Sequence, residues 1–122
     1  MARLYGQNPP EERFAGHYAS VNDLIWKQVE RALRDGVDVI IDCGFWTRES
    51  RDAARECVSA AGGTPKFYSV ACPESVMRAR TIELSKHPPP DSLWIDENAF
   101  DKLKAGFEAM NDDEEYQLID GA

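Results

Sequence analysis

The sequence is short of positive charge. Lys and Arg together number 14 against 22 Asp and Glu, so the 122-residue chain carries a formal net charge of −8 at pH 7. Duplex nucleic acids and anionic membranes attract proteins that cluster Lys and Arg on one face. This balance argues against nucleic acid and membrane as main partners. It leaves small anionic ligands open, because they need only a local positive pocket.

Long hydrophobic runs and cysteine motifs are also missing. No stretch approaches the length of a membrane-spanning helix, and the first residues lack the apolar run of a secretion signal. The three cysteines, Cys43, Cys57 and Cys72, have no CxxC or metal-like spacing. Scattered cysteines of this kind are typical of reduced thiols. We therefore expect a cytoplasmic protein.

The usual motifs of nucleophilic catalysis are absent from the sequence. No serine lies in a GxSxG elbow, and His17 and His87 are too far apart in the chain for a local metal or triad motif. These absences give no support to a serine hydrolase or a histidine-based metal site.

The most informative stretch is Gly36–Arg51, GVDVIIDCGFWTRESR. Its β-branched run from Val37 to Asp42 lacks clean alternation, which predicts a strand covered on both faces. Gly44 permits a tight turn, and Thr47 can cap the helix that follows. Because ligands of open α/β sheets bind where strands deliver their carboxyl ends, a site is expected at this elbow.

The rest of the chain alternates helices with strands. Apolar spacing and turn residues predict helices over Glu11–Asp35, Thr47–Ala61 and Pro73–Lys86 and a fourth helix capped by Asp96, with strands at Val37–Asp42, Lys66–Ala71 and Tyr116–Ile119. Residues 1–10 are predicted as a lead-in, and the acidic run Asp112–Glu115 as a solvated loop. This order predicts an α/β fold with parallel strands joined by right-handed crossovers. We expect one domain over residues 1–122.

Three segments resemble a known family. GVDVIIDCGFWTRESRD, the upstream LIWKQVERAL and the downstream VACPESVMRAR are similar to the AAA-domain family of small predicted ATP-binding P-loop kinases, which is related to small-molecule kinases and zeta-toxin-like phosphotransferases. The resemblance runs from about Leu4 to Asp120. It implies a magnesium and nucleotide role for Asp42 and a phosphate contact for Arg80 in a lid helix. Leu84 stands at the next lid-arginine position, which removes one phosphate contact.

The family's GxxxxGK[ST] phosphate loop has no counterpart in the sequence. None of the eight glycines is followed by Lys, so the backbone nest and the lysine that hold phosphates are missing. The resemblance therefore implies a truncated P-loop-kinase-like parallel sheet of about three strands flanked by helices, without the first strand and its loop. That strand would lie between Val37–Asp42 and Lys66–Ala71. Unpaired apolar edges at the gap predict a homodimer through the first helix or the sheet edge.

Each candidate site residue has two interpretations. Asp42 can hold magnesium, or it can end the strand and cap the turn. Thr47, Arg48 and Arg51 can bind an anion at a helix N-terminus, or they can form a cap and a solvated basic face. Trp46 can stack on a ligand, or it can pack in the core.

Three functions follow from these interpretations. The first is a non-catalytic binding or assembly module with weak affinity for a small anionic ligand. The alternative is a small-molecule kinase, using Mg-ATP, whose phosphate loop comes from another chain or an upstream segment. In that case Asp42 and Arg80 contribute to phosphotransfer. The third is a new pocket for an apolar ligand among Phe45, Trp46 and Phe67.

Overall fold

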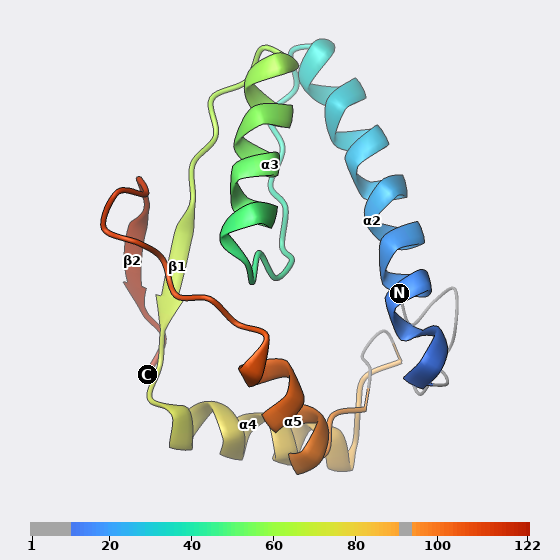
Figure 1. Ribbon diagram of the computed structural model, residues 1–122, viewed down its shortest axis with the longest axis vertical. Helices are drawn as coiled ribbons and strands as arrows, with labels where there is room; N and C mark the ends of the chain where they lie inside the picture. Colours follow the sequence, from blue (N-terminus) through green and yellow to red (C-terminus); the bar gives the residue numbers. More distant parts are fainter. Residues whose placement is uncertain (1–10, 91–93) are drawn as a thin grey trace. The chain divides into compact units, whose positions relative to one another are not determined.

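The computed structural model describes residues 11–90 and 94–122. Its elements, labelled in Figure 1, are α2 (Glu11–Arg34), α3 (Arg48–Ala60), β1 (Tyr68–Ala71), α4 (Glu74–Lys86), α5 (Glu97–Ala105) and β2 (Gln117–Asp120). The α/β class and the parallel pairing predicted from the sequence are confirmed. The lead-in predicted for residues 1–10 lies outside the described residues.

The chain divides into two compact units, which are described separately. The first comprises residues 1–25 and 73–104, and the second comprises residues 26–72 and 105–122. In the first unit, α4 and α5 are joined by ion pairs. Arg78 of α4 bonds to Asp101 of α5 at 2.7 Å and lies over the ring of Phe100. Lys104 contacts Glu74 at 2.6 Å. The hydrogen bond from Lys104, followed by that from Arg78, lowers the pKa of Glu74.

The second unit contains a parallel pair of strands. Tyr68 lies opposite Gln117 and Ala71 opposite Asp120. The ladder extends beyond the strands, since Gln117 N donates to Phe67 O and Gly121 N to Ala71 O. The second strand predicted from the sequence is therefore present, shortened at its start, and its neighbour is the last strand of the chain.

The stretch Val37–Asp42 was predicted to be a strand, and this prediction is wrong. It follows Gly36, which ends α2 with a φ of 76°, in the left-handed region that favours glycine. Among the described residues the stretch has no strand pairing, and Figure 1 draws it without an arrow, as part of the connection from α2 to α3. Among the described residues the sheet has two strands instead of about three. The reason is that β1 pairs with β2 on one edge, and no described strand lies beside Val37–Asp42.

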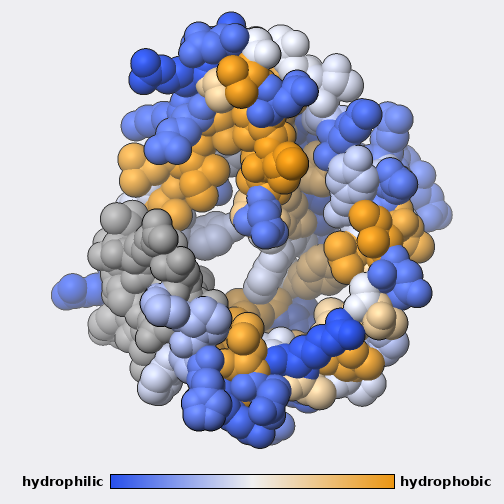
Figure 2. Space-filling model, turned by 180° about the vertical axis from the view of Figure 1, so that it is seen from behind, coloured by the Kyte–Doolittle hydropathy of each residue, from blue (hydrophilic) through white to orange (hydrophobic). Residues whose placement is uncertain are grey.

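The hydrophobic core is small. The buried apolar residues among those described are Val29, Ala54 and Ala61. Large apolar side chains are exposed instead, including Ile40 at 96% and Val70 at 64%. Figure 2 shows such apolar side chains, in orange, on the surface of the molecule. Much apolar surface that a parallel α/β sheet normally covers is thus in contact with solvent.

None of the described helices combines the length and apolar character needed to cross a membrane.

Candidate functional site

The elbow before α3 is built by a glycine, a tryptophan and a cap. A Cβ atom at Gly44 would collide with the indole of Trp46, so only glycine fits under this ring. Thr47 then caps α3 as predicted: its Oγ1 accepts from Ser50 N at 3.1 Å, and its own N–H donates to Ser50 Oγ at 3.3 Å. The cap fixes where the helix begins and how its first side chains point.

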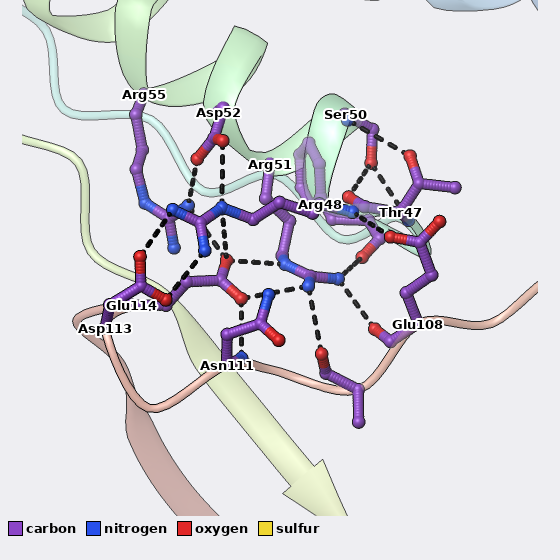
Figure 3. Close-up of polar contacts among 12 residues, drawn as sticks. Thr47, Arg48, Ser50, Arg51, Asp52, Arg55, Glu108, Asn111, Asp113 and Glu114 are labelled. Atoms are coloured by element: carbon purple, nitrogen blue, oxygen red, sulfur yellow. Dashed lines mark hydrogen bonds and ion pairs between the residues drawn. The ribbon is translucent and has the colours of Figure 1, made fainter.

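Arg51, one turn into α3, is completely enclosed. Its Nε and Nη2 donate to the two carboxylate oxygens of Glu114 at 2.7 and 2.9 Å. Nη1 donates to the carbonyls of Phe45 and Glu108, and Nη2 also donates to the carbonyl of Ala109. All five guanidinium N–H groups are therefore used (Figure 3). At 1% exposure, Arg51 ties the elbow, α3 and the segment around Glu114 together.

Arg48 and Arg55 flank Arg51 and also face carboxylates. Arg48 donates to Asp52 at 2.8 Å and to both oxygens of Asp113 at 2.8 and 3.1 Å. Arg55 bonds to Asp52 and Glu114, each at 3.0 Å. Three guanidiniums are thereby held by side-chain carboxylates of the same chain (Figure 3).

We call the stretch from Glu108 to Glu114 the acidic segment. Glu108 Oε2 accepts from Arg48 N, at the N-terminus of α3, at 2.9 Å, and Glu108 N donates to Trp46 O. A carboxylate thus occupies the end of the helix where an anion would be stabilised. The sequence-based interpretation of Asp112–Glu115 as a solvated loop is wrong at Glu114, whose side chain has 0% exposure.

The pKa values in this cluster reflect these bonds. The hydrogen bond from Arg51 lowers the pKa of Glu114 to about 2, against the opposing effect of burial. Arg48 likewise lowers the pKa of Asp113. The arginines therefore favour the ionised form of Asp113 and Glu114, the two carboxylates that bond to Arg48 and Arg51.

Thr47, Arg48 and Arg51 lie together at the start of α3, as predicted. Trp46 precedes them and is half-buried, with its indole over Gly44. Arg80 lies on α4, in the other unit, and is exposed. Anion binding by these residues stays a prediction, and any such ligand would have to compete with carboxylates that are already bonded.

Asp42 ends the unpaired stretch and is exposed. Within the described residues, no group of three or more His, Cys, Asp or Glu side chains is close enough to hold a metal ion. Asp42 could supply one carboxylate to Mg²⁺, which binds through one or two carboxylates together with substrate phosphates. Its metal role stays a prediction. Nearby Cys43 is half-buried, and burial followed by the charge of Asp42 raises the pKa of its thiol.

A cavity of about 990 Å³ lies in the second unit, between Asp38–Cys43 and Thr64–Val70. We call this cavity the slot. Its apolar lining residues include Val39, Ile41, Phe45, Val58, Phe67 and Val70. Phe45 and Phe67 meet edge to face with ring centroids 5.3 Å apart, and Trp26 adds a further edge contact to Phe45. The aromatic cluster thus contains Trp26, whereas the sequence pointed to Trp46.

Sequence reasoning missed Glu108 and Glu114, which are 57 and 63 residues from Arg51 along the chain. The available signal was the complementary charge of two short runs, RESRDAAR and NDDEE. Complementary charge alone does not show that one glutamate is buried under an arginine. That contact depends on the fold.

Comparison with known protein families shows which family the chain belongs to. A family model described as an AAA domain matches residues 1–110. The chain belongs to this AAA domain family. Curated proteins and solved structures gave no match. The P-loop kinase-like AAA domain suspected from the GFW elbow and the segment after Pro73 is thereby confirmed at the level of the family.

Proposed function

We propose that this AAA-domain chain is a binding or assembly module and does not carry out phosphotransfer by itself. The observation that supports this proposal is the complete use of the Arg51 guanidinium, with Arg48 and Arg55 bonded beside it. Phosphoryl transfer requires free cations and backbone N–H groups that hold phosphates. At this helix N-terminus the guanidiniums and the Arg48 N–H bond to the chain's own carboxylates, and the Ser50 N–H bonds to the Thr47 hydroxyl.

The charge balance at α3 supports the same conclusion. Three guanidiniums bond to the carboxylates of Asp52, Asp113 and Glu114, and a fourth carboxylate, that of Glu108, accepts from the backbone N–H of Arg48. A polyphosphate would have to displace some of these carboxylates and would meet repulsion from the others. The 122 residues also hold no GxxxxGK[ST] loop, so the backbone nest and the lysine with which that motif holds phosphates are missing from them. Any affinity of this site for a small anion is therefore weak.

A calorimetric titration of the 122-residue protein with MgATP tests this proposal. We expect no heat of binding up to about 1 mM ATP, which corresponds to a binding free energy weaker than about −4 kcal/mol. Micromolar binding that is lost in Arg48→Ala would overturn the proposal. Arg31→Ala is the matched control, because Arg31 is exposed near the end of α2 and is remote in sequence from the cluster.

If MgATP does not bind, a second variant tests whether the chain's own carboxylates are the cause. Glu108→Gln combined with Asp113→Asn removes two carboxylates that bond to Arg48 but leaves the buried Arg51–Glu114 pair intact. If the chain's own carboxylates are what excludes anions, the double variant gains measurable affinity for inorganic phosphate. Equal phosphate binding by both proteins would contradict this explanation.

The second candidate function is a small-molecule kinase assembled with a phosphate loop from another chain or an upstream segment. The exposure of Asp42 favours it, because this carboxylate has no ion-pair partner among the described residues. Asp42 would then contribute to magnesium binding, and Arg80 to phosphate binding. Phosphotransfer that appears only when a loop-bearing polypeptide is added, and that Asp42→Asn abolishes, would favour this candidate.

We also propose that the protein forms a homodimer in the cytoplasm, through α2 or the sheet edge. The exposed apolar side chains support the proposal, among them Leu24 on α2 and Leu118 on β2. Light scattering at micromolar concentration tests it. A mass of twice 13.7 kDa is expected, and a monomer at these concentrations would contradict the proposal.

A further inference from the structure

The first wall of the slot is a backbone without partners. Within the described residues, the N–H and C=O groups of Asp38–Cys43 make no hydrogen bond to another segment. These residues nevertheless include the apolar run Val39–Ile41, and Ile40 is almost fully exposed. A β-branched run with an unpaired backbone is a template for pairing with another strand.

The opposite wall is the free edge of β1. Phe67 O and Ala71 O accept from β2, so Phe67, Ser69 and Ala71 direct their backbone groups toward β2. Because the backbone groups of a strand alternate between its two edges, those of Tyr68 and Val70 point to the other edge. Both residues line the slot. The slot is therefore bordered on two sides by backbone groups that have no hydrogen-bond partner among residues 11–90 and 94–122.

The lining between these walls is apolar. Val58 of α3, Leu33 of α2 and the Phe45–Phe67 pair contribute to it. An occupant must therefore offer apolar side chains and, along its length, N–H and C=O groups on both edges. A small apolar ligand satisfies only the first requirement, whereas an extended polypeptide satisfies both.

We propose that the slot takes up an extended apolar strand from another polypeptide, which pairs with Asp38–Cys43 on one side and with Tyr68 and Val70 on the other. The inserted strand would join the two walls into one continuous sheet and bury Val39 and Ile41. This inference rests on the proposed assembly function and names the partner that one binding surface accepts.

A second copy of the chain is the weaker occupant. Its unpaired apolar stretch, Val37–Asp42, already forms a wall of its own slot, so inserting it elsewhere would dismantle that slot. A second copy would also bring a further net charge of −8 to a slot whose first wall carries Asp38 and Asp42. A neutral or basic strand avoids this repulsion.

A fluorescein-labelled peptide of sequence Lys-Val-Ile-Val-Ile-Val-Lys is the probe, with fluorescence anisotropy as the readout on the full 122-residue protein. We expect saturable binding at micromolar concentration. The control peptide carries N-methyl groups on alternate backbone nitrogens, which removes hydrogen-bond donors and keeps every side chain. The control should bind at least about tenfold more weakly. Equal binding of the two peptides would overturn the proposal and would identify the slot as a pocket for apolar ligands.

A protein variant locates the binding. Ile40→Lys places a positive charge, like those at the two ends of the peptide, in the slot wall at a side chain that is already 96% exposed, so the isolated chain should keep its fold. The variant should weaken peptide binding at least about tenfold. Leu84→Lys is the matched control, because it introduces the same charge at an exposed apolar residue of α4, and its affinity should equal that of the wild type.

Other outcomes separate this inference from the proposed function. No peptide binding at about 100 µM would overturn the inference, whether or not the protein is a dimer in the same sample. MgATP binding by the protein would overturn the proposed function instead, whatever the peptide does. The two proposals therefore fail in different experiments.

Discussion

Arg51 shows how one side chain can decide between two interpretations of a basic helix. A solvated arginine leaves most of its donors to water, whereas Arg51 gives all five to protein acceptors and is 1% exposed. A buried guanidinium requires a paired carboxylate, because an isolated charge in the interior is very costly. Glu114 supplies that carboxylate, and the two residues are best understood as a structural pair.

Removing Arg51 should therefore destabilise the protein strongly. Arg51→Ala leaves the Glu114 carboxylate buried without its main partner, and we expect a loss of about 3–5 kcal/mol in the free energy of unfolding. Urea denaturation followed by circular dichroism measures it. Arg31→Ala should change the free energy by less than about 1 kcal/mol. Equal effects of the two variants would show that the buried pair has no special role.

The same pair predicts a dependence of stability on pH. The folded-state pKa of Glu114, about 2, lies below its ordinary value of 4.5, so the carboxylate stabilises the fold above pH 4.5 and loses this effect as pH falls toward 2. The shift corresponds to about 3 kcal/mol. Unfolding curves between pH 7 and pH 2 measure the loss. In Glu114→Gln this component should vanish, and an unchanged pH profile would contradict the assignment.

At the scale of elements, the elbow between Gly44 and Thr47 sets the direction of α3. The Trp46 indole packs where any other residue at position 44 would place its Cβ. Gly44→Ala should displace Trp46, with a shift in tryptophan emission and a loss of about 1–3 kcal/mol in stability.

Gly16→Ala is the natural control for the elbow. A Cβ at Gly16 meets nothing within 4 Å, and the residue lies inside α2. Alanine should stabilise this helix by about 1 kcal/mol and leave the emission unchanged. An elbow variant as stable as this control would show that Trp46 does not need the space above Gly44.

The helices were predictable because their signals are local. The predicted end of the first helix at Asp35 and the predicted start of the second at Thr47 each lie within one residue of the structure, and Asp96 caps α5 through Ala99 N at 2.8 Å. The pairing state of Val37–Asp42 was not predictable in this way. Composition shows that a stretch is suited to a strand, but pairing depends on what lies beside it.

The sequence predicted where the candidate residues lie in the fold, but it did not predict which carboxylates bond to them. The Thr47, Arg48 and Arg51 cluster was found at the start of α3, because cap and charge spacing are local. Its carboxylate partners come from the acidic segment, more than 50 residues later in the chain. These carboxylates lie next to the arginines because the segment before β2 packs against α3, and no local sequence pattern predicts that packing.

At the scale of the whole molecule, the decisive feature is a sheet whose edges are open. β1 has a partner on one side only, and Val39–Ile41 has none among the described residues. With so few buried apolar residues, the chain has hydrophobic surface left to bury through association. This property links the fold to the proposed assembly function.

Amide hydrogen exchange along Asp38–Cys43 tests this central claim most directly. The protein is diluted until light scattering reports a monomer, and exchange is followed by mass spectrometry with peptides covering this stretch and α3. The account predicts that the 38–43 amides exchange as fast as those of an unstructured peptide, whereas the α3 amides are protected. Protection of 38–43 equal to that of α3 would mean that the stretch already has a hydrogen-bonded partner within the chain, and the open sheet would be contradicted.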